Sequence, residues 1–231
     1  MSLEQQLDGL TAELAAGGKI PPPLLARLMA DIRAQIASGA SRRALKAGDT
    51  APVFRLKNQD GTWVRSNILI ARGPLVISFY RGRWCSYCNL ELQALEKARA
   101  EIESRNASLV VISMQNEAYS RKAVTDNKLG FASLIDHDGA VAERFGLRYN
   151  LSDQLIELHK SLGLELGLIN GEAGWSLLMP ARYVIGRDGI VAYAEINTDY
   201  THRAEPRDLL PILDQLARSD FAPGRFRPSQ P

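Results

Sequence analysis

The chain has 231 residues, and 28 basic against 26 acidic side chains leave a net charge of only +2. Hydrophobic residues make up 45% of the sequence and charged residues 23%, which is typical of a globular protein with one substantial core. Such a small net charge gives no support for nucleic acid or an acidic membrane as a partner. The N-terminus shows no signal peptide, and the longest apolar runs fall short of the roughly 20 residues that cross a bilayer. We therefore expect a cytoplasmic protein without a membrane segment.

Two amphipathic helices are predicted in residues 1–45, ahead of the main domain. In the first, leucines recur at alternating spacings of four and three, at Leu3, Leu7, Leu10 and Leu14. Two glycines and a run of three prolines end it, and a second apolar stripe over 25–36 stops at Gly39. This helical hairpin either packs on the main domain or serves as a dimerisation arm. A homodimer formed through these helices is therefore left open.

The main domain, residues 46–219, is predicted to alternate strands and helices. In chain order we expect a hairpin over 46–65, a strand at 75–80, a helix at 85–104, a strand at 109–114, a helix at 117–128, a strand at 131–135 and a helix at 139–146. Strands rich in valine and isoleucine, separated by helices, indicate a parallel core sheet with crossover helices.

The second half of the main domain interrupts this alternation. Residues 151–178 read as an insertion, and a second hairpin over 181–195 should add antiparallel strands to the sheet. A last helix is predicted at 205–218. Residues 220–231 are rich in proline and glycine and are expected to form a flexible tail.

The only two cysteines, Cys85 and Cys88, follow the apolar strand at 75–80. Ligands and catalytic groups collect at the carboxyl edge of such sheets. If the helix begins at about Cys85, both sulfurs lie on one face of its first turn, and a disulfide can close with little backbone movement.

In a reducing compartment this spacing favours a redox-active or metal-binding pair. A metal needs about four ligands, and His137, His159 and His202 are scattered, so no metal is expected. Buried structural cysteines remain an alternative.

The residues around the pair favour the thiolate form. A free cysteine has a pKa of about 8.5, which helix N-termini and nearby cations lower. Arg81 and Arg83 would supply the positive charge, and Trp84 would cover the sulfur. Cys85 lies at the helix terminus, where the dipole is strongest. We therefore expect Cys85 to be the more exposed, attacking sulfur and Cys88 to resolve the intermediate.

The stretch from Trp84 to Cys88, between a strand and a helix, resembles the thioredoxin active site. That resemblance implies that the first cysteine is the nucleophile and the second resolves. Pro180, just before the strand at 181–186, is similar to the cis-proline that faces the site in thioredoxin folds.

The flanking segments resemble peroxiredoxins of the alkyl hydroperoxide reductase/thiol-specific antioxidant (AhpC/TSA) family. The segments that carry the resemblance are 47–56, 134–149 and 183–195, and it extends over about 46–218. It implies an α/β, thioredoxin-like fold, a central mixed sheet flanked by helices, with an N-terminal helical extension.

This second resemblance assigns the nucleophile differently. Aligned on Phe79-Tyr80 and Glu91, the family's peroxidatic cysteine falls on Cys88 and its threonine on Cys85. The family's proline falls on Arg81. Its peroxide-polarising arginine falls near Pro180, with Arg182 two residues later. The identity of the attacking sulfur therefore stays open at this point.

Together these features predict a thiol-dependent antioxidant oxidoreductase that needs no cofactor. A thiolate would attack a peroxide, and the neighbouring cysteine would condense with the sulfenic acid to a disulfide. A thioredoxin- or glutaredoxin-type reductant would then restore the dithiol. Nearby arginines would stabilise the thiolate and the departing oxygen. The alternatives are a thioredoxin-like protein disulfide reductase, which acts on the disulfides of other proteins, and a non-catalytic redox sensor or interaction module.

Overall fold

The structure is a computed structural model that describes residues 1–17 and 20–220. Its helices are α1 (Leu3–Ala15), α2 (Pro22–Ser38), α3 (Ser66–Arg72), α4 (Ser86–Glu103), α5 (Glu117–Asn127), α6 (Ala140–Arg144), α7 (Asp153–Ser161), α8 (Leu166–Ile169) and α9 (Leu210–Asp220). Its strands are β1 (Arg55–Asn58), β2 (Trp63–Arg65), β3 (Leu75–Phe79), β4 (Ser108–Ser113), β5 (Ala132–Ile135), β6 (Arg148–Asn150), β7 (Ser176–Leu178), β8 (Ala181–Ile185) and β9 (Val191–Ile196). All but the first residue of the predicted tail lie outside the described residues. Within these residues, no helix is long and apolar enough to cross a membrane.

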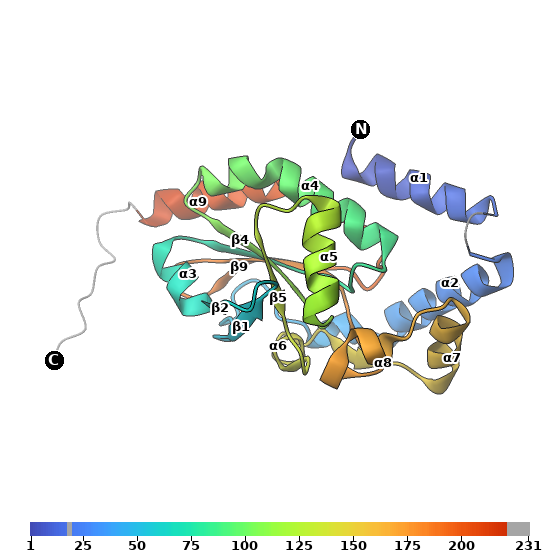
Figure 1. The fold of residues 1–231 in the computed structure, drawn as a ribbon. Helices are drawn as coiled ribbons and strands as arrows, with labels where there is room; N and C mark the ends of the chain where they lie inside the picture. The colour runs from blue at the N-terminus through green and yellow to red at the C-terminus, as the bar shows by residue number, and fades with distance from the viewer. Residues whose placement is uncertain (18–19, 221–231) are drawn as a thin grey trace.

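A seven-stranded mixed sheet forms the centre of the molecule, with the strand order β2-β1-β5-β4-β3-β8-β9 (Figure 1). β3, β4 and β5 run parallel, as their crossover helices require. β8 and β9 add an antiparallel hairpin at one side, and β1 and β2 add another at the opposite side. The predicted α/β fold with a central mixed sheet is confirmed.

The sheet separates two hydrophobic clusters, because successive side chains of a strand point to opposite faces. On one face Val76 packs with the buried residues of α4 and with those of the C-terminal helix. On the other, Leu75 and Ile77 pack around Phe145. β3 is buried along its whole length, which accounts for its continuous apolar sequence.

Two features have no counterpart in the prediction from sequence. Helix α3 follows β2 directly and is only seven residues long, without a side-chain cap at its N-terminus. β6 and β7 pair as a separate two-stranded sheet, three residues each, at the two ends of the inserted segment. Elements this short carry too little periodicity to be recognised from sequence.

Helix α1 lies along α4 and is fixed to the domain at several points (Figure 1). Its Leu3 and Leu7 are buried in the same cluster as the α4 side chains. The Glu205 carboxylate accepts a hydrogen bond of 2.6 Å from the Leu3 N–H, which satisfies one of the free donors at the helix start. Farther along, Thr11 shares a hydroxyl hydrogen bond with Tyr87 of α4, at 3.1 Å. α1 is thus part of the domain surface that lies next to the cysteines.

Candidate active site

The two cysteines occupy the start of α4, as the sequence predicts. Cys85 is the residue that precedes the first helical turn, and Cys88 lies inside that turn. Both are free thiols, and their residues are 4% and 0% exposed, so Cys85 is only marginally more accessible than Cys88. The loop from β3 to α4 turns at Gly82, whose φ is +138°. A side chain there would lie 2.6 Å from the Trp84 Nε1 atom, so the turn requires glycine.

The two thiols differ in acidity. The pKa of Cys85 is lowered to about 6, first because the Cys88 thiol donates a hydrogen bond to it. Burial raises the pKa of Cys85, but the hydrogen bond from the Cys88 thiol, the charges of Arg81 and Arg203 and a backbone hydrogen bond from Cys88 together outweigh it. Burial raises the pKa of Cys88 well above its ordinary value, and its hydrogen bond to Cys85 and the Cys85 charge raise it more. These shifts favour the thiolate at Cys85, with Cys88 as its hydrogen-bond donor.

A closed ionic network lies behind Cys88. The Glu91 carboxylate accepts hydrogen bonds from Arg182 Nη2 at 2.9 Å and from Arg203 Nε at 2.7 Å. Ser78 Oγ on β3 donates to the same carboxylate at 3.1 Å. Burial opposes ionisation, but the two arginine charges outweigh it and lower the pKa of Glu91. Arg203 also places its Nη2 3.9 Å from the Cys88 sulfur, so this network holds the second cysteine.

Arg81 stands on the other side of the pair, next to Cys85. Its guanidinium carbon lies 3.8 Å from the ring centroid of Tyr200 and 4.7 Å from that of Trp84. The residue is 4% exposed, and its buried Nε has no hydrogen-bond partner among the described residues. Buried donors of this kind are normally paired. The charge of Arg81 is thus free to act on Cys85 and on a molecule bound beside it.

Trp84 lies beside the cysteine pair, whereas the side chain of Arg83 lies away from it. Trp84 stacks on Arg81 and packs edge-on against His159 of the insertion, at 5.9 Å between ring centroids. Arg83 was expected to support the thiolate, but its guanidinium forms an ion pair with Asp126 on α5. Since that side chain is 38% exposed and its charge is already paired, Arg83 does not belong to the site.

Pro180 also differs from the expectation. The peptide bonds of the described residues are all trans, so Pro180 does not have the cis geometry of thioredoxin folds. Both sides of this bond are held by backbone pairing. The Met179 N–H donates to the Leu147 carbonyl, and the Pro180 carbonyl accepts from Asn197. Pro180 still lies at the same sheet edge as the cysteines, because Ala181 pairs with Phe79 at the end of β3.

A cavity of 380 Å³ opens over Cys85. Its lining residues come from α1, α2, the start of α4, the insertion and the loop after β9, and include Leu14, Leu28, Met29, Leu162 and Tyr200. Arg81 and Cys85 line it, but Cys88 does not. Burial lowers the pKa of His159, another lining residue, to about 4, so this histidine is neutral near pH 7. Arg81 is then the one cation among the described residues that line the cavity.

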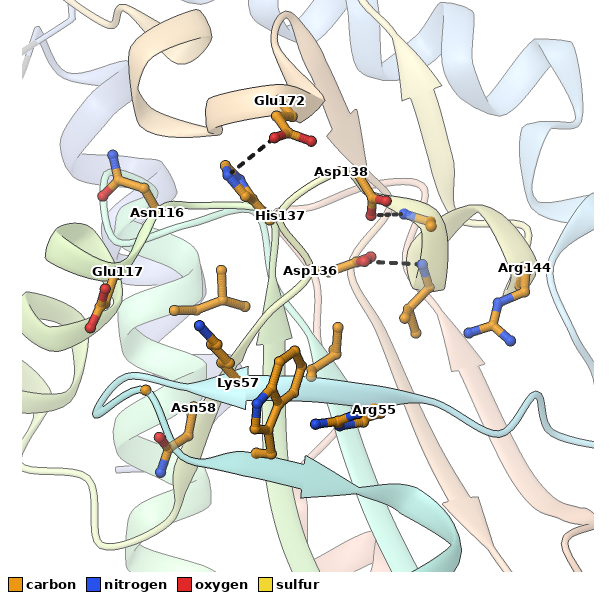
Figure 2. A pocket seen from close by; sticks show the side chains of 16 residues that line it. Arg55, Lys57, Asn58, Asn116, Glu117, Asp136, His137, Asp138, Arg144 and Glu172 are labelled. Carbon is orange, nitrogen blue, oxygen red and sulfur yellow. Dashed lines mark hydrogen bonds and ion pairs between the residues drawn. The ribbon is translucent and has the colours of Figure 1, made fainter.

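A larger cavity, 730 Å³, lies away from the cysteines over β1 and the start of α6 (Figure 2). Its wall carries both signs of charge, with Arg55, Lys57 and Arg144 on one side and Asp138 and Glu172 on the other. Arg55 stacks on Trp63, 4.0 Å from the ring centroid. Neither cysteine and none of the other predicted site residues lines this cavity.

Sequence reasoning missed Arg203 and Tyr200. Both come from the loop after β9, more than 110 residues beyond the cysteines in the chain. No local motif marks them, and only the closure of the sheet by β8 and β9 brings their loop to the start of α4. Their one sequence signal is an arginine and a tyrosine in a polar loop that follows a predicted strand.

Comparison with known proteins agrees with this geometry. Residues 47–194 match the AhpC/TSA family. A Mycobacterium tuberculosis protein named as a peroxiredoxin, MT1643, is 29% identical over 117 residues, which are 51% of this chain and 76% of that protein. The crystal structure of peroxidoxin BcpB from the same species superimposes with a TM-score of 0.58 at 23% identity, over 76% of this chain and 97% of the other.

A more distant structure extends the likeness of fold. A yeast mitochondrial 1-Cys peroxiredoxin, studied for thiol resolution through glutathione and thioredoxin systems, gives a TM-score of 0.57 at 17% identity. That match spans 80% of this chain and 84% of the yeast protein. The family match covers well over half of the sequence and includes both cysteines. This chain therefore belongs to the AhpC/TSA family, as a peroxiredoxin-like protein with a thioredoxin fold.

Proposed function

We propose that this protein is a thiol peroxidase in which Cys85 attacks the peroxide and Cys88 resolves the intermediate. The observation that carries the proposal is the asymmetry of the pair. Cys85 lines a cavity and has a lowered pKa, whereas Cys88 is sealed below it and has a raised one. Only the thiolate form of cysteine is a strong nucleophile, and only Cys85 combines that form with access to a small molecule.

In the first step the Cys85 thiolate attacks the terminal oxygen of a hydroperoxide, ROOH. A sulfur–oxygen bond forms while the O–O bond breaks, so the sulfur is oxidised to a sulfenic acid and the peroxide is reduced. The leaving alkoxide takes a proton from water and departs as an alcohol. Arg81 is the positive group beside this oxygen, because Pro180 stands where the family arginine would fall and Arg182 is bound to Glu91.

In the second step Cys88 attacks the sulfur of the Cys85 sulfenic acid. A disulfide forms, and the hydroxyl group leaves as water with the Cys88 proton. The negative charge of Cys85 is one cause of the high pKa of Cys88, and the neutral sulfenic acid removes it. Arg203, 3.9 Å from the Cys88 sulfur, then favours the second thiolate. Oxidation of Cys85 thus activates its partner.

The disulfide is returned to the dithiol by two electrons from a dithiol reductant of the thioredoxin or glutaredoxin type. Because α1, α2 and the insertion cover Cys85, the reductant's thiol must pass through the opening of the cavity or displace these helices. A homodimer through the N-terminal helices and a place in the cytoplasm stay predictions. Light scattering of the purified protein measures the first directly.

One assay tests the proposed function. The purified protein is supplied with a thioredoxin system and, separately, with hydrogen peroxide, an organic hydroperoxide or insulin. We expect turnover of a peroxide, and a mass loss of two hydrogens per chain after a single oxidation. Persistent sulfinic acid, or disulfides between chains only, would contradict a resolving pair.

Protein disulfide reduction is the second candidate, because the Trp84–Cys88 stretch resembles the thioredoxin site. The covered position of Cys85, a residue that is 4% exposed beneath two helices, favours a small peroxide over a protein disulfide as the oxidant, because a protein disulfide could reach the sulfur only after these helices move. Insulin reduction at a rate above that of peroxide reduction would reverse this order. A redox sensor would instead oxidise reversibly without turnover of either substrate.

A further inference from the structure

Half of the residues that line the cavity over Cys85 lie outside the part of the chain that matches the family, most of them in the N-terminal helices. α1 and α2 contribute Leu10, Leu14, Leu25, Leu28 and Met29, and all of these precede residue 47. The insertion adds Leu162 and Leu164. The N-terminal extension therefore supplies an apolar wall that faces the reactive sulfur. This surface has no part in the chemistry of the two thiols themselves.

The size of the cavity exceeds what the smallest peroxide needs. A water molecule occupies about 30 Å³ in the liquid, and hydrogen peroxide has only one more oxygen. The cavity measures 380 Å³, within the range of about 300–1,000 Å³ of small-molecule sites. Most of this volume would stay unused by hydrogen peroxide. An organic group of roughly ten carbon-sized units fits the space.

The polar groups of the cavity lie together at one end. Arg81 and the Cys85 sulfur are adjacent, and the unpaired Nε of Arg81 is a donor without a partner among the described residues. Two acidic residues belong to the same helices. Asp31 on α2 interacts with Arg81: burial raises the pKa of Asp31, and the Arg81 charge opposes the rise. Glu13 on α1 lines the cavity and is exposed. A ligand that fits places its oxygens at Arg81 and Cys85 and an apolar body against the leucines.

We propose that α1 and α2, together with the insertion, determine the substrate specificity of the site by favouring hydroperoxides that carry an apolar chain over hydrogen peroxide. This inference rests on the proposed peroxidase function and adds to it the segments of this chain that select the substrate. α1 is held in place by its buried leucines, by Glu205 and by the hydroxyl pair of Thr11 and Tyr87. The pocket is therefore formed before the substrate binds, which lowers the cost of binding.

The first experiment measures kcat/KM for hydrogen peroxide and for n-alkyl hydroperoxides of increasing chain length. Each buried methylene should raise kcat/KM by up to about fourfold, and the rise should level off when the cavity is full, at roughly ten carbons. A flat profile in the wild-type protein overturns the proposal.

Pocket-filling variants assign the effect to the extension. Met29→Trp and Leu14→Trp place a larger side chain in the cavity, from α2 and α1 respectively. Each should remove most of the chain-length dependence, so that kcat/KM for a long-chain hydroperoxide falls toward the value for hydrogen peroxide in the same variant. The matched control is Ile36→Trp, on the same helix as Met29 but 52% exposed and outside the lining. Equal effects of the control and the pocket variants would overturn the proposal.

A second measurement is independent of turnover. Unreactive n-alkanols, the products of the reaction, should protect Cys85 from iodoacetamide, and protection should increase with chain length in the wild-type protein but not in Met29→Trp. If alkanols protect in this way but no peroxide is reduced, the pocket stands and the peroxidase function fails. If peroxides are reduced but protection does not depend on chain length, the pocket proposal fails alone.

Discussion

Cys85 and Cys88 are three residues apart, yet their surroundings have opposite characters. Cys85 faces a cavity with apolar walls and one buried arginine that has an unpaired donor. Cys88 is enclosed, with the Glu91 carboxylate and its two arginines behind it. One turn of helix thus separates the Cys85 sulfur, which small molecules reach through the cavity, from the Cys88 sulfur, which is surrounded by protein groups.

The difference arises from distant segments and not from the helix that carries both residues. α1, α2 and the insertion enclose the space in front of Cys85. β8 and the loop after β9 supply the charges behind Cys88. In the first group, α1 and α2 precede the part of the chain that matches the family, and the second group includes the closing strands of the sheet. Each prediction below alters one side of this comparison.

The largest effect is expected from Cys85→Ser. It removes the thiolate that faces the cavity, so peroxide reduction should fall by several orders of magnitude, as loss of a nucleophile does in other enzymes. Cys88→Ser is the matched variant, which should still react once with peroxide and accumulate sulfenic acid. Trapping by dimedone with mass detection distinguishes the two. If Cys85→Ser reacts at the wild-type rate while Cys88→Ser is inert, the roles of the two sulfurs are exchanged.

Arg81→Met should reduce the rate of peroxide attack by about 10²–10³-fold, the usual cost of removing one charge-stabilising donor from an active site. Methionine keeps an apolar side chain between Trp84 and Tyr200, so the fold should persist. Arg83→Met is the control, since its guanidinium is paired with Asp126 near the surface. Stopped-flow fluorescence with hydrogen peroxide measures both rates. Equal losses in the two variants would show that Arg81 has no special place in the reaction.

Glu91→Gln tests the ionic network that encloses Cys88. The variant leaves two buried arginines without their carboxylate, and loss of one partner of a buried ion pair typically costs about 3–5 kcal/mol of stability. The control, Glu117→Gln, breaks an exposed pair with Arg121 and should cost less than about 1 kcal/mol. Urea denaturation gives both free energies of unfolding. A cost for Glu91→Gln no greater than that of the control would mean that the network is not a structural support.

Much of the fold could be predicted from the sequence, because its main elements have strong local patterns. β3 is a continuous apolar run, and α4 begins beside the cysteine pair and ends near the predicted residue. The hairpin of β8 and β9 has a turn sequence that forms in the predicted place. These features depend on interactions between residues that are close together in the chain. A local sequence pattern is therefore enough to predict them.

The site could be predicted only in part. The cysteines and Arg81 were found because they are adjacent in sequence, whereas Arg203 reaches Cys88 from 115 residues away. The structure does not bring the Arg83 side chain to the pair, because Gly82, with its left-handed φ, turns the chain between the two arginines. Arg81 then faces the rings of Trp84 and Tyr200, and Arg83 faces α5. Neither the backbone conformation of a loop nor a contact between segments far apart in the chain produces a periodic sequence pattern. Neither could therefore be predicted from the sequence.

The smallest and most specific effect concerns pH. In the reduced protein Cys85 has a pKa lowered to about 6, so the thiolate predominates at neutral pH and is lost as the pH falls through that value. Alkylation of Cys85 by iodoacetamide should thus be nearly constant from pH 7 to 9 and fall tenfold per pH unit below the pKa. The hydrogen bond from Cys88 is the largest cause of the shift. Cys88→Ala should therefore move the midpoint upward, while Cys88→Ser, which keeps a donor, should move it less. A wild-type midpoint near that of an ordinary thiol would contradict the asymmetry of the two sulfurs.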